Sequence, residues 1–410
     1  MLKSFSDLVI IEMAHIYNGP YCGLLFAHLG AEVIKVEPLT GERLRSRARG
    51  DKDPHEFVML NSNKKSVALD LKSQEGKDVL LRLIEKADVL IENYAPGTLE
   101  RLGLGPETLL EHNPRLVVAS GKGYGTTGPY AAMPAMDLTV QAMSGAISTT
   151  GFSDSAPVKT GPAFTDFSGG IHLFGGAMAA LYDREKTGKG QVVEVSMHDT
   201  IYPMLTSALS MLYNYPDTEL PERTGNRHSG LGIAPYNVYR ASDGWLAIIC
   251  ASDRHWTRMA EALGIHEAAD NPLFADSVLR AQNMDALDAM ITAVTSQLTR
   301  DEISGKLSIA GVPFAPVKTL REVDTDPHLI ERGMIQYVEH PENGRVPVVG
   351  NPLRMSRAGE SRPFTPAPKV AADQAEVLGR LLSIPLDEAE SLLGGRRNDY
   401  GTQSLLKKNI

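Results

Sequence analysis

The 410-residue chain has only two cysteines, Cys22 and Cys250, and no long uninterrupted hydrophobic run. Two distant cysteines cannot form a disulfide framework, which favours a reducing compartment. No apolar stretch approaches the roughly 18 residues of a membrane-spanning helix, and the first residues lack the apolar core of an export signal. These absences predict a globular, cytoplasmic protein without a membrane partner.

Positive charge is also scarce, because 41 lysines and arginines stand against 50 aspartates and glutamates, for a net charge of −9. That balance argues against nucleic acid as a partner. The sequence lacks a Gly-x-Gly-x-x-Gly fingerprint, a P-loop, a Cys/His metal cluster and a Gly-x-Ser-x-Gly elbow. Dinucleotide chemistry, P-loop ATP use, a bound metal and serine hydrolysis are therefore disfavoured, and carboxylate chemistry remains.

What is present is an alternation of strand and helix patterns over the first two hundred residues. Strands are predicted at 8–11, 32–37, 66–71, 88–92, 115–120 and 191–197, and helices at 20–29, 74–87, within 97–112 and at 168–186. This alternation predicts an α/β fold with a doubly wound, parallel, Rossmann-like sheet. Ligand sites are then expected in the loops after Glu12, Glu37, Glu92 and Ser120, at the carboxyl ends of the strands.

The rest of the chain predicts a second, smaller α+β domain. We assign 1–213 to the large domain, 214–232 to a polar linker, 233–325 to the small domain, and 326–410 to a return linker and the C-terminal part of the large domain. Two strands joined across the turn at 242–244 open the small domain, and helices follow at 253–263, 277–298 and 300–309. A closing β pair is expected within 337–354, and a loose tail from about Gly394.

The segment 161–170, Gly-Pro-Ala-Phe-Thr-Asp-Phe-Ser-Gly-Gly, places Asp166 where a loop becomes a helix. Free N–H groups and the helix dipole favour an ionised carboxylate there, and such a group can attack an acyl carbon. Gly169 and Gly170 would offer bare N–H groups to the resulting oxyanion. The alternative interpretation is that Asp166 only caps the helix.

Several further segments occur in a characteristic order. They are His15-x-x-x-Gly19-Pro20, Leu-Gly-Ala-Glu-Val-Ile-Lys-Val-Glu-Pro at 29–38, Asn-Lys-Lys-Ser at 63–66, Leu-Asp-Leu-Lys at 69–72, Glu-Asn-Tyr at 92–94, Gly-Thr-Leu-Glu-Arg-Leu-Gly at 97–103 and Lys-Thr-Gly-Lys-Gly-Gln-Val-Val-Glu-Val-Ser at 186–196. With Asp166, this order closely resembles the class III CoA-transferases of the formyl-CoA and L-carnitine type. The resemblance covers nearly the whole chain, with fixed spacing over 1–200.

The resemblance implies a homodimer of two interlocked rings, with coenzyme A or acyl-CoA bound across the large domain as substrate and no permanently bound cofactor. It assigns Asp166 as the nucleophile. Attack on a donor thioester, with succinyl-CoA as a candidate, would give an aspartyl anhydride and CoA thiolate. Exchange through an aspartyl-CoA thioester would then pass CoA to a short carboxylic or dicarboxylic acid.

The resemblance also assigns further residues. CoA contacts are implied at His15, Leu69, Lys72, Asn93, Tyr94 and Arg101. The residues alone support other interpretations. Leu69 and Tyr94 would be core residues, and Lys72 and Arg101 would be solvated surface charges. His15 would be a polar loop residue that caps the following helix. Asp137 matches an acidic position that orients groups near the active site, although it could instead cap a helix over 138–144.

Arginines at 43, 45, 47 and 49 follow the second predicted strand. A solvated loop is the common explanation for such a run, but one of them, with Arg47 as our candidate, could clamp a substrate carboxylate or a CoA phosphate. Arg227 and His228 lie in a loop that is shorter than the glycine-rich active-site loop of the formyl-CoA type, which puts oxalate as acceptor in doubt. We therefore include both as candidate substrate-binding residues.

Two other functions stay open. An acyl-CoA racemase of the same superfamily would need a histidine directly before Asp137, where this chain has Met136. A non-catalytic acyl-CoA-binding protein would keep the groove without the chemistry. Retention of Asp166 beside its glycines argues against that second alternative.

Overall fold

The computed structural model describes residues 5–47, 52–357 and 363–393, and the chain divides into two compact units. Unit 1 comprises Met1–Val140, Ala163–Ile201 and Asp326–Ile410, and unit 2 comprises Gln141–Pro162 and Tyr202–Thr325. The predicted large domain included 141–162 and 202–213, which the structure groups with unit 2. Whether the predicted boundaries separate parts that fold independently remains a prediction.

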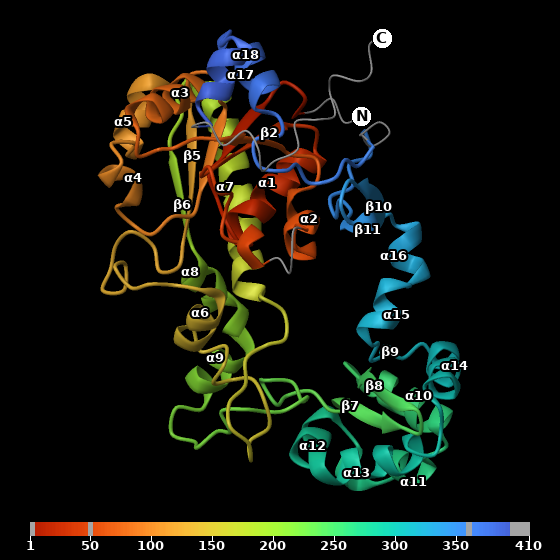
Figure 1. Ribbon diagram of the computed structural model, residues 1–410. Coiled ribbons are helices and arrows are strands. Elements are labelled where there is room, and N and C mark those ends of the chain that lie inside the picture. Colours follow the sequence, from red (N-terminus) through yellow and green to blue (C-terminus); the bar gives the residue numbers. More distant parts are fainter. Residues whose placement is uncertain (1–4, 48–51, 358–362, 394–410) are drawn as a thin grey trace. The chain divides into compact units, whose positions relative to one another are not determined.

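Unit 1 contains a six-stranded sheet in the order β3-β2-β1-β4-β5-β6, and every neighbouring pair is parallel. The strands are β1 (Val9–Glu12), β2 (Glu32–Glu37), β3 (Lys65–Ala68), β4 (Val89–Glu92), β5 (Val117–Lys122) and β6 (Val192–Ser196). The expected Rossmann-like sheet is thereby confirmed (Figure 1).

Alternating side chains along each strand fill two separate cores. On one face, Ile10, Val33 and Val89 pack against α1 (Asn18–His28) and α7 (Phe164–Thr187). On the other face, Ile11 and Leu90 pack against helices of the opposite layer. That layer consists of α3 (Gln74–Ile84), α4 (Thr98–Arg101), α5 (Pro106–His112), α17 (Gln374–Leu382) and α18 (Leu386–Ser391). Because both faces of the central strands are covered, β1 and β4 carry the apolar runs Val-Ile-Ile and Val-Leu-Ile.

The remaining elements of unit 1 surround this sheet. They are α2 (His55–Asn61), α8 (Met197–Ile201), α16 (Pro327–Glu331) and the antiparallel pair β10 (Ile335–His340) and β11 (Gly344–Val349). The β pair expected within 337–354 is confirmed, starting two residues earlier. Helix α6 (Asp137–Met143) runs from unit 1 into unit 2.

Unit 2 is built on an antiparallel sheet of β7 (Tyr236–Ala241), β8 (Gly244–Ile249) and β9 (Phe314–Pro316). The two strands predicted across the turn at 242–244 are confirmed. Its helices are α9 (Thr206–Asn214), α10 (Asp253–Leu263), α11 (His266–Ala269), α12 (Ser277–Gln282), α13 (Met284–Thr295), α14 (Arg300–Ala310) and α15 (Leu320–Asp324). The helix predicted over 277–298 is two helices that meet at Asn283.

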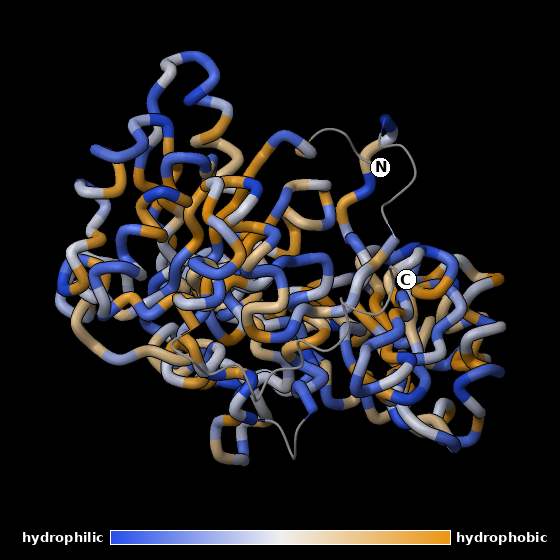
Figure 2. Tube along the Cα trace, turned by 45° about the horizontal axis from the view of Figure 1, so that its top comes forward, coloured by the Kyte–Doolittle hydropathy of each residue, from blue (hydrophilic) through white to orange (hydrophobic). Residues whose placement is uncertain are grey.

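Hydrophobic stretches of the chain gather inside each unit, as Figure 2 shows in orange. In the ranges that the structure describes, no helix is both long and apolar enough to cross a membrane. The tail expected from Gly394 lies outside the described residues.

Candidate active site

The loops after β1 and β4 meet where the strand order reverses, the position at which doubly wound sheets bind ligands. The N–H of His15 donates to Asn93 Oδ1 at 2.9 Å, and Asn93 Nδ2 donates to the carbonyl oxygen of His15 at 2.9 Å. The His15 and Tyr94 rings lie 5.5 Å apart between centroids. Three of the predicted CoA-contacting residues therefore form one cluster.

His15 is neutral at physiological pH in this cluster. Burial, followed by the positive charges of Arg43 and Lys35, lowers the pKa of His15 to about 4. Burial together with the carboxylate of Glu92 raises the pKa of Tyr94 to about 12. Both rings are thus uncharged hydrogen-bonding groups, suited to an amide or an aromatic base rather than to pairing with a phosphate.

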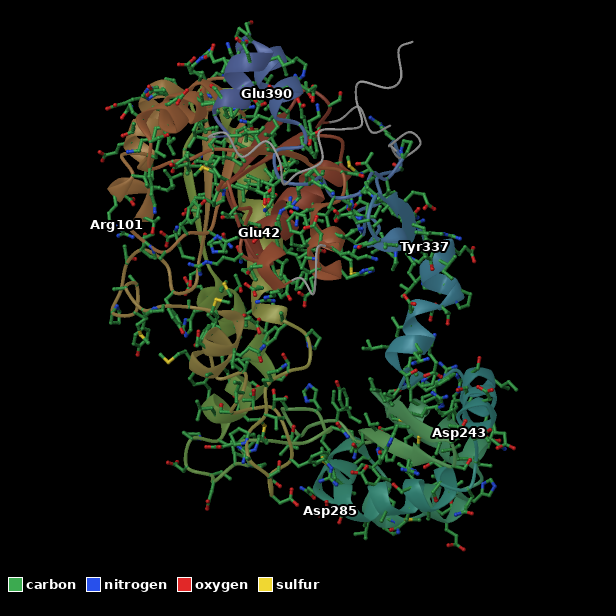
Figure 3. All side chains as sticks on the ribbon, viewed as in Figure 1. Glu42, Arg101, Asp243, Asp285, Tyr337 and Glu390 are labelled. Atoms are coloured by element: carbon green, nitrogen blue, oxygen red, sulfur yellow. The ribbon has the colours of Figure 1, made fainter. Side chains whose placement is uncertain are left out.

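The other three predicted CoA-contacting residues differ in exposure. Lys72 is exposed in the turn before α3, and Arg101 is exposed at the end of α4, where its Nη2 donates to Thr98 Oγ1 at 2.8 Å (Figure 3). Leu69 is 1% exposed in the core, and its N–H donates to the Glu37 carbonyl oxygen. The core-packing alternative therefore describes the Leu69 side chain.

Of the arginine run, Arg45 is not solvated. It is buried, with its Nε 2.8 Å from Glu37 Oε2 and its Nη1 3.0 Å from Asp53 Oδ2. Arg47 is exposed, donates to the hydroxyl of Tyr17 at 3.3 Å and lies 3.7 Å from Glu56. Arg43 is exposed, and Arg49 lies outside the described residues. Arg47 and Arg43 thus remain available for an anionic ligand.

Asp166 lies in the first turn of α7, which begins four residues before the predicted start, and is 9% exposed. The N-cap residue Ala163 offers no side-chain cap. Asp137 supplies it, because its Oδ1 accepts from the N–H of Thr165 at 3.0 Å, from Thr165 Oγ1 at 2.6 Å and from the N–H of Asp166 at 3.4 Å. The structure thus brings the two predicted carboxylates together, and Asp137 caps α7.

The expectation that Asp166 stays ionised at neutral pH is wrong. Burial, and then the negative charge of Asp137, raises the pKa of Asp166 to about 7, while Arg47 acts in the opposite direction. Asp137 takes the free N–H groups at the start of α7 that were expected to stabilise the Asp166 carboxylate. Asp166 therefore divides between both protonation states near pH 7.

The expected role of Gly169 and Gly170 as bare N–H donors is also wrong. Both lie inside α7, where backbone N–H groups donate to carbonyls four residues earlier. Their missing side chains serve close packing on α1 instead. A Cβ at Gly169 would lie 2.2 Å from Asn18 Nδ2, and one at Gly170 would lie 2.6 Å from the Asn18 carbonyl oxygen.

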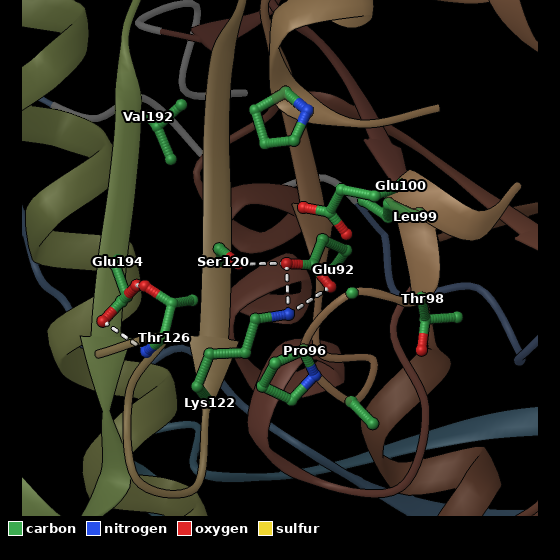
Figure 4. Close-up of a pocket in the computed structure, with 13 residues that line it drawn as sticks. Glu92, Pro96, Thr98, Leu99, Glu100, Ser120, Lys122, Thr126, Val192 and Glu194 are labelled. Carbon is green, nitrogen blue, oxygen red and sulfur yellow. Dashed lines mark hydrogen bonds and ion pairs between the residues drawn. The ribbon is translucent and has the colours of Figure 1, made fainter. Parts of the chain in front are cut away.

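A pocket of about 200 Å³ lies beside the carboxyl ends of β4 and β5, and Val192 and Glu194 of the edge strand β6 also line it (Figure 4). On its wall, Lys122 Nζ contacts both carboxylate oxygens of Glu92, at 2.7 and 2.9 Å, and donates to the Tyr94 carbonyl oxygen at 2.8 Å. Ser120 also donates to Glu92. The buried Glu92–Lys122 pair fixes the loop that carries Asn93 and Tyr94.

Arg227 and His228 belong to unit 2. Arg227 Nη2 lies 2.7 Å from both Asp285 and Asp288, on α13, where Figure 3 labels Asp285. His228 contacts Ser207 at 3.4 Å and packs edge-on against the Tyr236 ring. These contacts hold Arg227 and His228 within unit 2, and their predicted substrate-binding roles stay predictions.

Sequence reasoning missed Tyr17, Asn18 and Lys122. The Tyr17 ring stacks on Phe167, next to Asp166, with 5.9 Å between centroids. Asn18 Nδ2 donates to the carbonyl oxygen of Asp166 at 3.3 Å. A charged residue ending a strand that begins Val-Val-Ala was the available signal for Lys122. The contacts of Tyr17 and Asn18 with α7 depend on packing.

Comparison with known proteins gives one consistent result. Residues 5–374 match the sequence model of CoA-transferase family III. The chain is 34% identical over 392 residues to formyl-CoA:oxalate CoA-transferase of Streptomyces avermitilis, covering 92% of this chain and 95% of that protein. It is 34% identical over 390 residues to succinyl-CoA:mesaconate CoA-transferase of Haloarcula hispanica, covering 92% and 96%. A crystal structure of a CaiB/BaiF family protein from Brucella suis superimposes with a TM-score of 0.80 at 34% identity, covering 91% and 98%.

Proposed function

The chain belongs to CoA-transferase family III, and on that premise we propose that Asp166 carries CoA transfer from an acyl-CoA donor to a short carboxylic or dicarboxylic acid. The observation that carries the proposal is a nearly buried carboxylate with its pKa raised to about 7, in the first turn of α7. A desolvated carboxylate is a stronger nucleophile than a hydrated one once it is ionised.

The proposed sequence balances without metal, ATP or redox change. An Asp166 oxygen attacks the thioester carbonyl, the C–S bond breaks, and CoA leaves as thiolate. The thiolate attacks the Asp166 carbonyl of this anhydride, releasing the donor acid and leaving an aspartyl-CoA thioester. The acceptor carboxylate then attacks the aspartyl-CoA thioester, which releases CoA thiolate and leaves a second anhydride. The thiolate attacks the acceptor carbonyl of this anhydride, so that the new acyl-CoA leaves and Asp166 regains its carboxylate.

We assign CoA binding to the cluster of His15, Asn93 and Tyr94, with Lys72 and Arg101 available for the phosphates. Succinyl-CoA is our candidate donor because relatives use it, and a dicarboxylic acid is our candidate acceptor because oxalate and mesaconate are acids of that kind. We assign Arg47 to attract an acceptor carboxylate, and its electrostatic effect on Asp166 supports that role.

We also propose a homodimer in the cytoplasm. Exposed apolar residues lie on one side of α7, among them Ile171 and Tyr182 at 51% and 68% exposure. Contiguous exposed apolar surface of this kind is typical of protein interfaces. The two free, buried cysteines fit a reducing compartment.

The test incubates the purified protein with succinyl-CoA and a panel of carboxylates and follows new acyl-CoA thioesters by mass spectrometry. Transfer is expected for the natural chain and lost in Asp166→Ala, while CoA still binds. Asp183→Ala, which removes an exposed carboxylate from the same helix, is the matched control. Hydroxylamine should trap Asp166 in the presence of donor. Transfer by Asp166→Ala, or loss of α-deuterium from a 2-methylacyl-CoA without exchange, would refute the proposal.

A further inference from the structure

Asn18 is a buried amide in an otherwise tightly packed position. It is the first residue of α1 and is 2% exposed, between α7 and β5. A Cβ at Gly121 would lie 2.3 Å from its Oδ1, and a Cβ at Gly169 would lie 2.2 Å from its Nδ2. Two glycines on different elements thus leave the space that this amide occupies.

The hydrogen bonding of Asn18 is one-sided. Its Nδ2 donates to the Asp166 carbonyl oxygen at 3.3 Å, whereas its Oδ1 is buried without a partner among the described residues. An unpartnered buried acceptor destabilises the folded state, and a leucine of similar shape would avoid it. Packing alone therefore does not explain an asparagine here, and the contact with Asp166 offers an explanation.

The backbone of Asp166 is held from both sides. Asp137 Oδ1 accepts from its N–H at 3.4 Å, and Asn18 Nδ2 donates to its carbonyl oxygen. In the described part of the chain, no residue forms a hydrogen bond with the Asp166 carboxylate itself. The residue is thus fixed through its main chain while its reactive oxygens stay unengaged.

We propose that Asn18 is a positioning residue that fixes the first turn of α7 so that the Asp166 carboxylate meets the thioester carbon. This inference rests on the proposed function and adds a residue to it. Small displacements of a reacting group can cost about 100-fold in rate. Asn18 touches neither the reacting oxygens nor the substrate in this role, so its loss should lower kcat and leave the KM for the donor unchanged.

The experiment compares Asn18→Leu with the natural chain, using kcat, KM and the rate at which hydroxylamine traps acylated Asp166. We expect kcat and the trapping rate to fall about 10- to 100-fold, with KM and the thermal midpoint retained. Asn113→Leu is the matched control, since Asn113 Nδ2 also donates to backbone carbonyls, those of Ile84 and Ala87, but away from Asp166. It should lower the thermal midpoint and leave kcat unchanged.

A second pair of variants separates positioning from packing. Gly121→Ala should displace Asn18, because the added Cβ would lie 2.3 Å from Asn18 Oδ1, and so lower both the thermal midpoint and kcat. The double variant Asn18→Ala/Gly121→Ala removes this clash and should restore the thermal midpoint but not kcat. Unchanged kcat in Asn18→Leu, or recovery of kcat in the double variant, would overturn the inference. A natural chain that shows no transfer and no trapped Asp166 with any donor would instead refute the proposed function.

Discussion

At the scale of single residues, the proposed mechanism makes activity depend on the fraction of Asp166 that is ionised. Because burial and Asp137 raise the pKa of Asp166 to about 7, the nucleophilic form predominates only above that pH. We expect kcat/KM to rise about tenfold per pH unit below pH 7 and to level off above it. Asp137→Asn keeps an oxygen that accepts from the Thr165 N–H but removes the charge, so the acid limb should move to lower pH.

The measurement is a pH profile of kcat/KM for both proteins with one donor and one acceptor. Arg47→Gln provides the opposite control, because Arg47 lowers the pKa of Asp166. Its acid limb should move to higher pH. Identical acid limbs in all three proteins would show that a different group controls the profile.

The position of Asp166 could be predicted from sequence, whereas its ionisation could not. The loop-to-helix transition predicted that Asp166 lies at the start of a helix, and Asp166 does lie in the first turn of α7. Its pKa depends on burial in the folded chain and then on Asp137, which lies 29 residues earlier in the chain. Likewise, Gly169 and Gly170 indicated a special position, but only the packing of α7 on α1 shows that close approach is the reason.

At the scale of helices and strands, sequence periodicity predicted the sheet because its strands are short apolar runs separated by helices of regular length. It did not predict α17 and α18, or the third strand β9 of unit 2, because these short elements are stabilised by what they pack against. Helix α17 docks on the edge strand β3. Gln374 Oε1 accepts from the N–H of Ala68 at 2.9 Å, and Gln374 Nε2 donates to the Ala68 carbonyl oxygen at 3.3 Å.

This contact predicts a stability effect without a catalytic one. Gln374→Leu leaves the polar backbone groups of Ala68 unpaired, and we expect it to lower the free energy of unfolding by about 1–3 kcal/mol. Urea unfolding measures the change, and kcat should stay within twofold of the natural value. Glu388→Gln, at an exposed position of α18, is the control and should change neither quantity. Unchanged stability in Gln374→Leu would show that water satisfies these groups.

At the scale of the whole molecule, the exposed side of α7 is the surface to which we assign the interface of the proposed homodimer. Ile171, Gly175, Ala179 and Tyr182 are exposed at helical spacing, and the two small residues permit another chain to approach closely. The opposite side of the same helix fills the core through Leu173 and Ala177. A single helix therefore carries Asp166, a core face and an unpaired apolar face, so association of two chains would bear directly on the active site.

We expect analytical ultracentrifugation of the natural protein at micromolar concentration to give twice the mass of one chain. The double variant Ile171→Glu/Tyr182→Glu should give the mass of a monomer. Stable dimers usually bury about 1,200–2,000 Å² or more, and two charges within such an interface cost more than a surface change. Leu386→Glu places the same charge at a leucine that is 61% exposed on α18 and should leave the dimer intact. Circular dichroism should show folded protein in every case. A dimer that persists in the double variant would exclude this side of α7 as its interface.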